Sequence, residues 1–274
     1  MSFATSLRQE AQSIFDSIWQ HPFVQGLAKG ELPREVIIHY VQQDTQYLNT
    51  YCKVYGMALA KAHTQAQMRA FYERIGLLLD GELVPHQNLC QVAGASYEAV
   101  RQKAAELAPT AHHYARHMLS VAQQGTLGEI VAVVLPCHWI YVDIAKQIVD
   151  ESHPAANHPF YDWISFYASD RMQAGLNELI TMLDELAASS GELDSYLMKS
   201  AFLDSCRLEY QFFDMAYKLE RWEPTPRTLP DIPPLPDADR VLERRDRPND
   251  ASLSDTRGLS DTRSLPALGG SRDV

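Results

Sequence analysis

Three predicted helices of this chain each place one ionisable group on a face that is otherwise apolar or aromatic. The groups are Asp44, Cys137 and Glu209. A buried carboxylate is costly unless it is paired, and a carboxyl group in apolar surroundings tends to have a raised pKa, which suits proton transfer near neutral pH. A thiol can be a nucleophile. The three groups together predict a small-molecule site inside a helical bundle.

Each group also has a purely structural interpretation. Asp44 could bond a tyrosine hydroxyl and lock helix packing, because it shares its face with Tyr40, Tyr47, Tyr51 and Tyr55. Glu209 could form a structural salt bridge, since it is the only charge on a stripe made of Phe202, Cys206, Phe213 and Ala216. A buried cysteine such as Cys137 is more often inert than reactive.

The stretch "LPCHWIYVDIAK", residues 135–146, combines the thiol with an unusual helix interior. Pro136 cannot donate a backbone hydrogen bond and tends to kink a helix. Cys137 and Tyr141 are four residues apart and so project from the same face. Tyr114 and Tyr167 lie in other helical segments and could also point inward.

The segments that must position these groups are all predicted to be helices. Apolar residues recur at helical spacing, and no segment alternates between apolar and polar residues. The predicted helices span 3–20, 32–62, 65–92, 97–107, 110–124, 127–150, 158–189 and 193–221. Pro33 stands near a helix start, where proline is tolerated, and Thr110 is the predicted N-cap of its helix. We therefore expect an all-α bundle of seven or eight helices.

The composition excludes several classes of protein. The chain has 274 residues, 46% of them apolar, and a formal net charge of −11, which argues against binding a nucleic-acid backbone. Its four cysteines lack Cys-x-x-Cys spacing, so a zinc site is not expected. The N-terminal segment has no signal-peptide pattern, and no window reaches the ~18 apolar residues of a membrane span. We expect a cytoplasmic protein with reduced thiols.

The composition changes after Trp222. Residues 224–274 hold eight of the 15 prolines and no aromatic residue. Such a segment buries too little apolar surface to offset the entropy of ordering it. The sequence therefore predicts a helical domain over 1–222 and a disordered tail over 223–274.

Two pairs of side chains have a spacing that metal ligands can use. His113 and His117 are four residues apart, as are Glu82 and His86. A di-metal carboxylate bundle uses Glu-x-x-His pairs that project inward, and the chain has none with both residues on an inward face. No metal is expected.

Several ordered motifs resemble the TenA family, also called thiaminase II. They are "HPFVQGLAKGELPREVIIHYVQQDTQYLNTY", "LPCHWIYVDIA", "YDWISFYAS" and "LEYQFFDMAY". The resemblance runs from about residue 3 to residue 222. It implies an all-α fold like that of haem oxygenase, without haem, and a homotetramer.

The resemblance also implies an activity. Family members hydrolyse the bond at the methylene on C5 of a 4-amino-2-methylpyrimidine, either in thiamin or in 4-amino-5-aminomethyl-2-methylpyrimidine. The product is hydroxymethylpyrimidine, which is salvaged into thiamin. Cys137 stands in the "PC" motif of the cysteine-bearing branch. No metal or organic cofactor is implied.

The family's residue roles carry over to matching positions. Cys137 matches the nucleophile, Glu209 the carboxylate that shuttles protons, and Asp44 the carboxylate that holds the aminopyrimidine edge. Tyr47 and Tyr141 match residues that bond or stack with the ring. The remaining matches are tyrosines that orient the thiol, Tyr114 and Tyr167, and lining residues, Tyr51 and Phe213.

Two other functions remain open at this point. A regulator could keep the pyrimidine pocket without catalysis, although the acidic charge argues against direct DNA contact. A metal-dependent oxidase could use the same fold, but it would need an inward cluster of histidines and carboxylates.

Overall fold

The computed structural model describes residues 2–81, 83–103 and 106–224, and these ranges contain helices and no strand. The prediction of an all-α fold is confirmed. The predicted tail lies outside the described residues from 225 onward. The helices are α1 (Phe3–Glu10), α2 (Gln12–Trp19), α3 (Pro22–Lys29), α4 (Arg34–Lys61), α5 (Gln65–Gly76), α6 (Leu83–Val92), α7 (Tyr97–Gln102), α8 (Pro109–Gln124), α9 (Leu127–Ser152), α10 (Tyr161–Tyr167), α11 (Asp170–Ala188) and α12 (Glu192–Lys218), with a π-helical segment, η1 (Leu77–Gly81), between α5 and α6.

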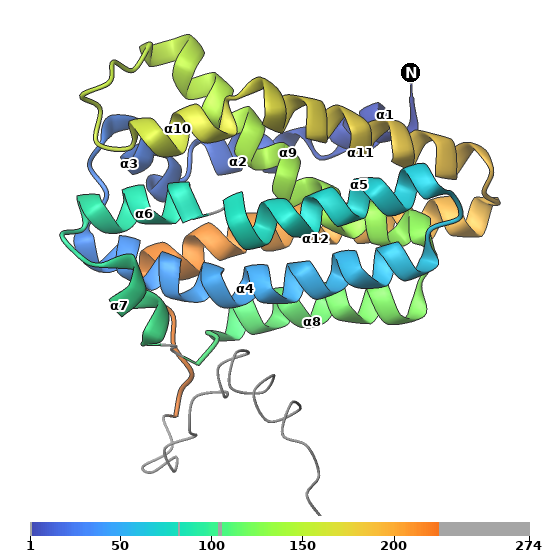
Figure 1. Ribbon diagram of the computed structural model, residues 1–274, viewed down its shortest axis with the longest axis horizontal. Helices are drawn as coiled ribbons and strands as arrows, with labels where there is room; N and C mark the ends of the chain where they lie inside the picture. The colour runs from blue at the N-terminus through green and yellow to red at the C-terminus, as the bar shows by residue number, and fades with distance from the viewer. Residues whose placement is uncertain (1, 82, 104–105, 225–274) are drawn as a thin grey trace, which may run out of the picture. The chain divides into compact units, whose positions relative to one another are not determined.

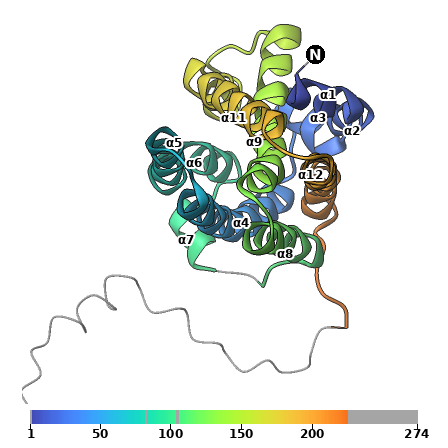
Figure 2. The ribbon, with the colours of Figure 1, turned by 90° about the vertical axis from the view of Figure 1, so that its right-hand side faces the viewer.

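Helix α9 is the centre of the bundle. It packs against α4, α8, α10, α11 and α12, and the view along the bundle shows α4, α8, α11 and α12 around it (Figure 2). Helices α4, α8 and α12 run side by side along the long axis (Figure 1). The three predicted chemical groups lie on α4, α9 and α12, so the packing of these helices on one another brings the groups together.

The sequence of α9 suits this central position. Thr126 and Glu129 form a capping box at its start, and apolar residues cover nearly all of its circumference, as expected of a helix surrounded by others. Among the described residues, α9 is the one helix long and apolar enough to cross a membrane. In the bundle, 72% of its most apolar stretch is buried, which is the behaviour of a core helix.

Three predicted helices are divided in the structure. Segment 3–20 breaks at Ala11, so that α1 packs on α11 and α12 while α2 packs on α12. Segment 158–189 breaks because the Ser169 side chain caps the amide of Met172 and starts α11. Segment 65–92 is interrupted by η1, and apolar periodicity alone does not reveal a π-helical turn.

The start of α8 corrects the prediction that Thr110 is an N-cap. The helix begins at Pro109, a favoured first position, and Ala108 is the N-cap. The Thr110 amide and hydroxyl instead donate to the Glu220 carboxylate at 2.9 and 3.1 Å. The preceding helix, α7, ends at Gln102 and is therefore shorter than the predicted segment 97–107.

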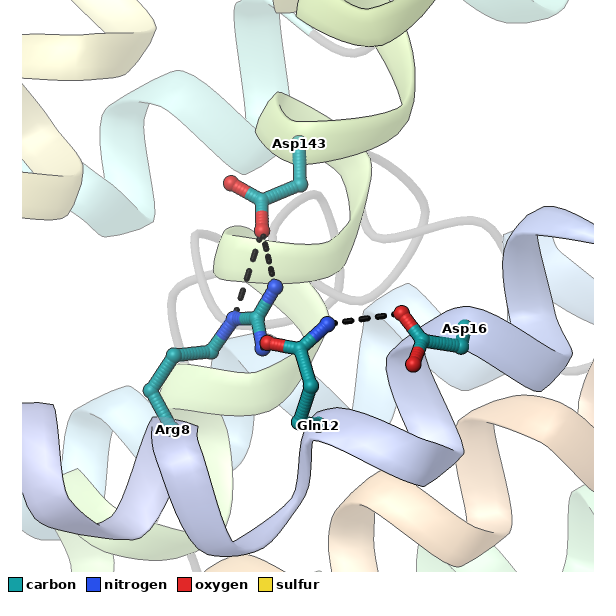
Figure 3. Close-up of polar contacts among 4 residues, drawn as sticks. All are labelled: Arg8, Gln12, Asp16 and Asp143. Carbon is teal, nitrogen blue, oxygen red and sulfur yellow. Dashed lines mark hydrogen bonds and ion pairs between the residues drawn. The ribbon is translucent and has the colours of Figure 1, made fainter.

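Polar contacts attach the N-terminal helices to α9 (Figure 3). Arg8 Nε and Nη2 donate to Asp143 Oδ2 on α9 at 3.3 and 3.0 Å, and Gln12 links Arg8 to Asp16. The Arg8 guanidinium also lies 3.5 Å over the ring of Phe15. Burial raises the pKa of Asp143, and the bonds and charge of Arg8 oppose that shift.

Replacing Arg8 by Met should destabilise the fold by about 1 kcal/mol at pH 7, because the pair is partly exposed. A raised pKa means that the folded state holds the Asp143 proton more tightly than the unfolded state. The cost of Arg8→Met should therefore shrink as the pH falls and Asp143 is protonated. Urea unfolding at pH 7 and pH 4 measures this. In an Asp143→Asn background the cost should lose its pH dependence, and an equal loss at both pH values in the native background would contradict the account.

Candidate active site

A cavity inside the bundle is bounded by α4, α5, η1, α9, α10 and α11. Five of the predicted site residues line it: Asp44, Tyr51, Cys137, Tyr141 and Tyr167. The other lining residues are Leu48, Tyr55, Arg74, Leu77, Leu78, His138 and Met172. Because the lining is mostly aromatic and aliphatic with a few polar groups, the cavity has the character of a small-molecule site.

The remaining predicted residues do not line the cavity but lie buried behind its wall. Glu209 is 2% exposed, and Tyr47, Tyr114 and Phe213 are equally enclosed. Glu209 connects to the cavity through a hydrogen bond with Cys137. Cys137 therefore lines the cavity and is at the same time hydrogen-bonded to Glu209.

Glu209 is held by hydrogen bonds in an apolar environment. Burial raises the pKa of its carboxyl group to about 8, hydrogen bonds with Tyr114 and Cys137 oppose the shift, and the negative charge of Asp44 adds to it. The Tyr114 hydroxyl donates to Oε1 at 2.8 Å. At neutral pH the carboxyl group is therefore mostly protonated and can donate a proton beside the thiol.

Tyrosine hydroxyls surround the thiol on several sides. Burial raises the pKa values of Tyr47, Tyr51, Tyr114 and Tyr141, so these side chains stay protonated. The Tyr51 hydroxyl donates to the carbonyl of Val134 at 2.5 Å, close to Pro136. The Tyr47 hydroxyl is buried near Glu209 and Tyr114, but it makes no hydrogen bond of regular geometry with a described residue.

Rings on α9, α10 and α12 form an aromatic stack at one side of the cavity. The Tyr141 and Tyr167 ring centroids are 5.0 Å apart, and the Phe213 ring, which is not part of the cavity lining, lies 5.8 Å from that of Tyr141. The hydroxyls of Tyr141 and Tyr40 are 2.5 Å apart. Tyr141 is therefore held by two neighbouring rings and by its hydroxyl.

Sequence reasoning missed the partner of Asp44. His86 Nε2 lies 2.7 Å from Asp44 Oδ2, and both side chains are buried. The sequence interpretation had considered His86 only with Glu82, which lies outside the described residues. No periodic pattern could have indicated this pair, because periodicity defines the face of a helix and not the helix opposite it.

Two further polar lining residues were also missed. Arg74 Nη2 donates to the Gly175 carbonyl at 2.7 Å and to Glu178 Oε2 at 2.8 Å. His138 Nε2 lies 2.8 Å from the Met172 carbonyl. Burial and the nearby Arg74 charge lower the pKa of His138 to about 4, so its imidazole is neutral.

Within the described ranges, no group of three or more His, Cys, Asp or Glu side chains is placed to hold a metal ion. Of the histidines considered as ligands, His86 is paired with Asp44. Nε2 of His117 is buried and makes no hydrogen bond of regular geometry with a residue that the structure describes. The described residues thus contain no inward cluster of the kind that a di-metal oxidase requires.

Comparison with known proteins places the chain among its relatives. The profile of the TENA/THI-4/PQQC family matches residues 8–219. The chain belongs to this family. It is 36% identical over 224 residues to a protein of Halalkalibacterium halodurans named aminopyrimidine aminohydrolase, and the alignment covers 81% of this chain and 98% of that protein.

Solved structures of TenA proteins share the fold. A TenA homologue from P. horikoshii OT3 superposes with a TM-score of 0.70 at 25% identity, covering 80% of this chain and 99% of that one. A Shewanella denitrificans OS217 domain with a heme oxygenase-like fold gives a TM-score of 0.62 at 14% identity, covering 78% and 92%. The predictions of the TenA family and of its fold are therefore confirmed.

The Tyr114 hydrogen bond should lower the pKa of the Glu209 carboxyl group, because it stabilises the carboxylate in a site where burial raises that pKa to about 8. Tyr114→Phe should therefore move the titration of Glu209 to higher pH. Infrared difference spectroscopy follows the band of the protonated carboxyl, and its absence in Glu209→Gln assigns it. A titration midpoint that is unchanged or lower in Tyr114→Phe would show that the hydrogen bond does not act on Glu209.

Proposed function

We propose that this protein is an aminopyrimidine aminohydrolase of the thiaminase II type. It hydrolyses 4-amino-5-aminomethyl-2-methylpyrimidine, and thiamin, to 4-amino-5-hydroxymethyl-2-methylpyrimidine. The observation that carries the proposal is the contact between Cys137 at the cavity wall and the buried, protonated Glu209 behind it. The name of the Halalkalibacterium halodurans relative supports the same activity.

Cys137 and Glu209 supply the covalent step and the proton transfers. The Cys137 sulfur forms a bond to a carbon of the pyrimidine ring and pushes an electron pair into the ring. That pair expels the nitrogen carried by the C5 methylene. The amine takes the Glu209 proton and leaves as ammonia, whereas the thiazolium of thiamin leaves as neutral thiazole and takes no proton. The ring then carries an exocyclic methylene, and one difficult displacement has become two easier steps.

Water completes the reaction at that methylene. With the amine substrate Glu209 is now a carboxylate, and it takes a proton from the water as its oxygen bonds to the methylene carbon. With thiamin that proton is released to solvent. The electron pair returns through the ring and expels the Cys137 sulfur, which restores the aromatic ring. The net change is the replacement of the amine or thiazole by a hydroxyl group, with one water consumed and, for thiamin, one proton released.

The other site residues bind the ring and support the reacting groups. Asp44 accepts a hydrogen bond from the 4-amino group, because a carboxylate suits an amine donor. Tyr51, Tyr141 and Tyr167 pack on the ring from the cavity wall. Tyr47 and Tyr114 hold Glu209 and the thiol in place, and Phe213 packs against Tyr141.

The family resemblance supplies the biological setting of the proposal. The product is salvaged into thiamin, and the enzyme works in the cytoplasm as a homotetramer without metal or organic cofactor. Large exposed apolar side chains such as Tyr72, Leu193 and Tyr196 are consistent with contacts between subunits. Two alternative functions differ in what happens in the cavity. A regulator would bind the pyrimidine there without turnover, and an oxidase would bind a metal ion there.

Cys137→Ser should lower the rate of product formation by about three orders of magnitude or more, because the serine hydroxyl is a far weaker nucleophile than the thiolate. The assay supplies 4-amino-5-aminomethyl-2-methylpyrimidine or thiamin to each protein, and chromatography measures hydroxymethylpyrimidine. The relative rates identify the preferred substrate. Cys52→Ser, on a half-buried cysteine outside the cavity lining, is the matched control and should keep wild-type activity.

Two results would reject this function. Binding of the pyrimidine without product from the wild-type protein would favour the regulator. Iron or manganese copurifying with the protein, together with activity that depends on it, would favour the oxidase. Elemental analysis of the purified protein measures the metal.

A further inference from the structure

We propose that His86 is a positioning residue that acts through Asp44 to recognise the amino-bearing edge of the pyrimidine. The inference rests on the proposed function and adds a residue from α6 to it. His86 is absent from the cavity lining, so its effect on a ligand must pass through Asp44.

The pair has the geometry of a strong, charge-assisted contact. His86 Nε2 and Asp44 Oδ2 are 2.7 Å apart, and the side chains are 4% and 6% exposed. A contact of this length between buried groups fixes the rotation of the carboxylate. A carboxylate accepts several hydrogen bonds, so the one from His86 leaves acceptor capacity for a ligand amine in the cavity that Asp44 lines.

A ring contact with the imidazole and the anchoring of α6 hold His86 in place. The ring of Tyr97, on α7, lies 5.7 Å from the ring of His86 at an interplanar angle of 31°. Two residues further along α6, Asn88 donates to the Pro159 carbonyl at 3.0 Å and accepts from the Trp163 amide at 3.3 Å. These contacts attach α6 to α10, which carries the cavity residue Tyr167. His86 therefore approaches Asp44 from a fixed position rather than from a mobile loop.

The contact also bears on Glu209, which is not part of the cavity lining. The negative charge of Asp44 contributes to the raised pKa of Glu209. A donor that fixes the position of the Asp44 carboxylate thus fixes both the ligand contact and this charge. The Asp44 carboxylate therefore has two roles: it binds the amino-bearing edge of the substrate, and its charge helps Glu209 to keep a proton.

A purely structural role would give a different pattern of ligand binding. If His86 only attached α6 to α4, its loss would loosen the cavity and weaken every ligand alike. If it positions Asp44, its loss should weaken only ligands that carry the amino group. The comparison therefore needs two ligands that differ in that group alone.

The ligands are 4-amino-5-hydroxymethyl-2-methylpyrimidine and its analogue without the 4-amino group. The variants are His86→Gln, whose amide nitrogen reaches the position of Nε2, and His86→Asn, whose shorter side chain does not. Asn88→Leu is the structural control, since Asn88 anchors α6 without contacting Asp44. Calorimetry measures each Kd, and thermal unfolding shows that each variant folds.

His86→Asn should weaken binding of the amino ligand by about 10- to 100-fold, the usual effect of a hydrogen bond to a charged group. It should change binding of the analogue by less than about threefold, and His86→Gln should stay within about threefold of wild type for both ligands, because only the Asp44 contact is at issue. Asn88→Leu should change both ligands by the same factor.

Equal losses for both ligands in His86→Asn, or identical behaviour of the Gln and Asn variants, would overturn the positioning role while leaving the proposed function intact. A wild-type protein that binds neither pyrimidine would overturn the proposed function itself. The two failures are distinguished because the second is seen in the wild-type protein alone.

Discussion

A carboxyl group buried inside a helical bundle must either keep a proton or be surrounded by hydrogen-bond donors, and Glu209 does both. Burial raises its pKa to about 8 while Tyr114 and Cys137 hold it by hydrogen bonds. Such a group is costly to the fold, because each unmet hydrogen bond in the interior would carry a desolvation penalty. The same cost gives the site an acid that is loaded at neutral pH next to a thiol.

The long helices are arranged so that this cluster can exist. Glu209, Cys137 and Asp44 come from α12, α9 and α4, so the site forms only when these three helices pack together. Pro136 leaves the carbonyl of residue 132 without its usual helical donor, and the Tyr51 hydroxyl donates to the neighbouring Val134 carbonyl. Cys137 thus follows a part of α9 that a side chain from α4 supports.

The sequence was sufficient to predict the long helices α4, α8, α9 and α12 and to single out the three central groups as candidates, because both depend on periodicity along one helix. The short helix α3 was not predicted. Cys137, Asp44 and Glu209 stood out as ionisable residues on apolar faces. The structure added what depends on two helices at once: the pairing of His86 with Asp44, and the packing of Phe213 on Tyr141 rather than in the cavity lining. The break at Ser169 carried a readable signal, a serine cap, whereas the π-helical η1 and the partner of Thr110 carried none.

The central claim is that the protonated form of Glu209, beside Cys137, is the reactive one, and the pH dependence of kcat/KM tests it most directly. With 4-amino-5-aminomethyl-2-methylpyrimidine as substrate between pH 6 and 9, kcat/KM should fall with an apparent pKa near the value of about 8 that burial gives Glu209. The fall occurs because deprotonated Glu209 cannot protonate the leaving group. A kcat/KM that rises steadily to pH 9, as for a thiol that only needs to ionise, would contradict the account.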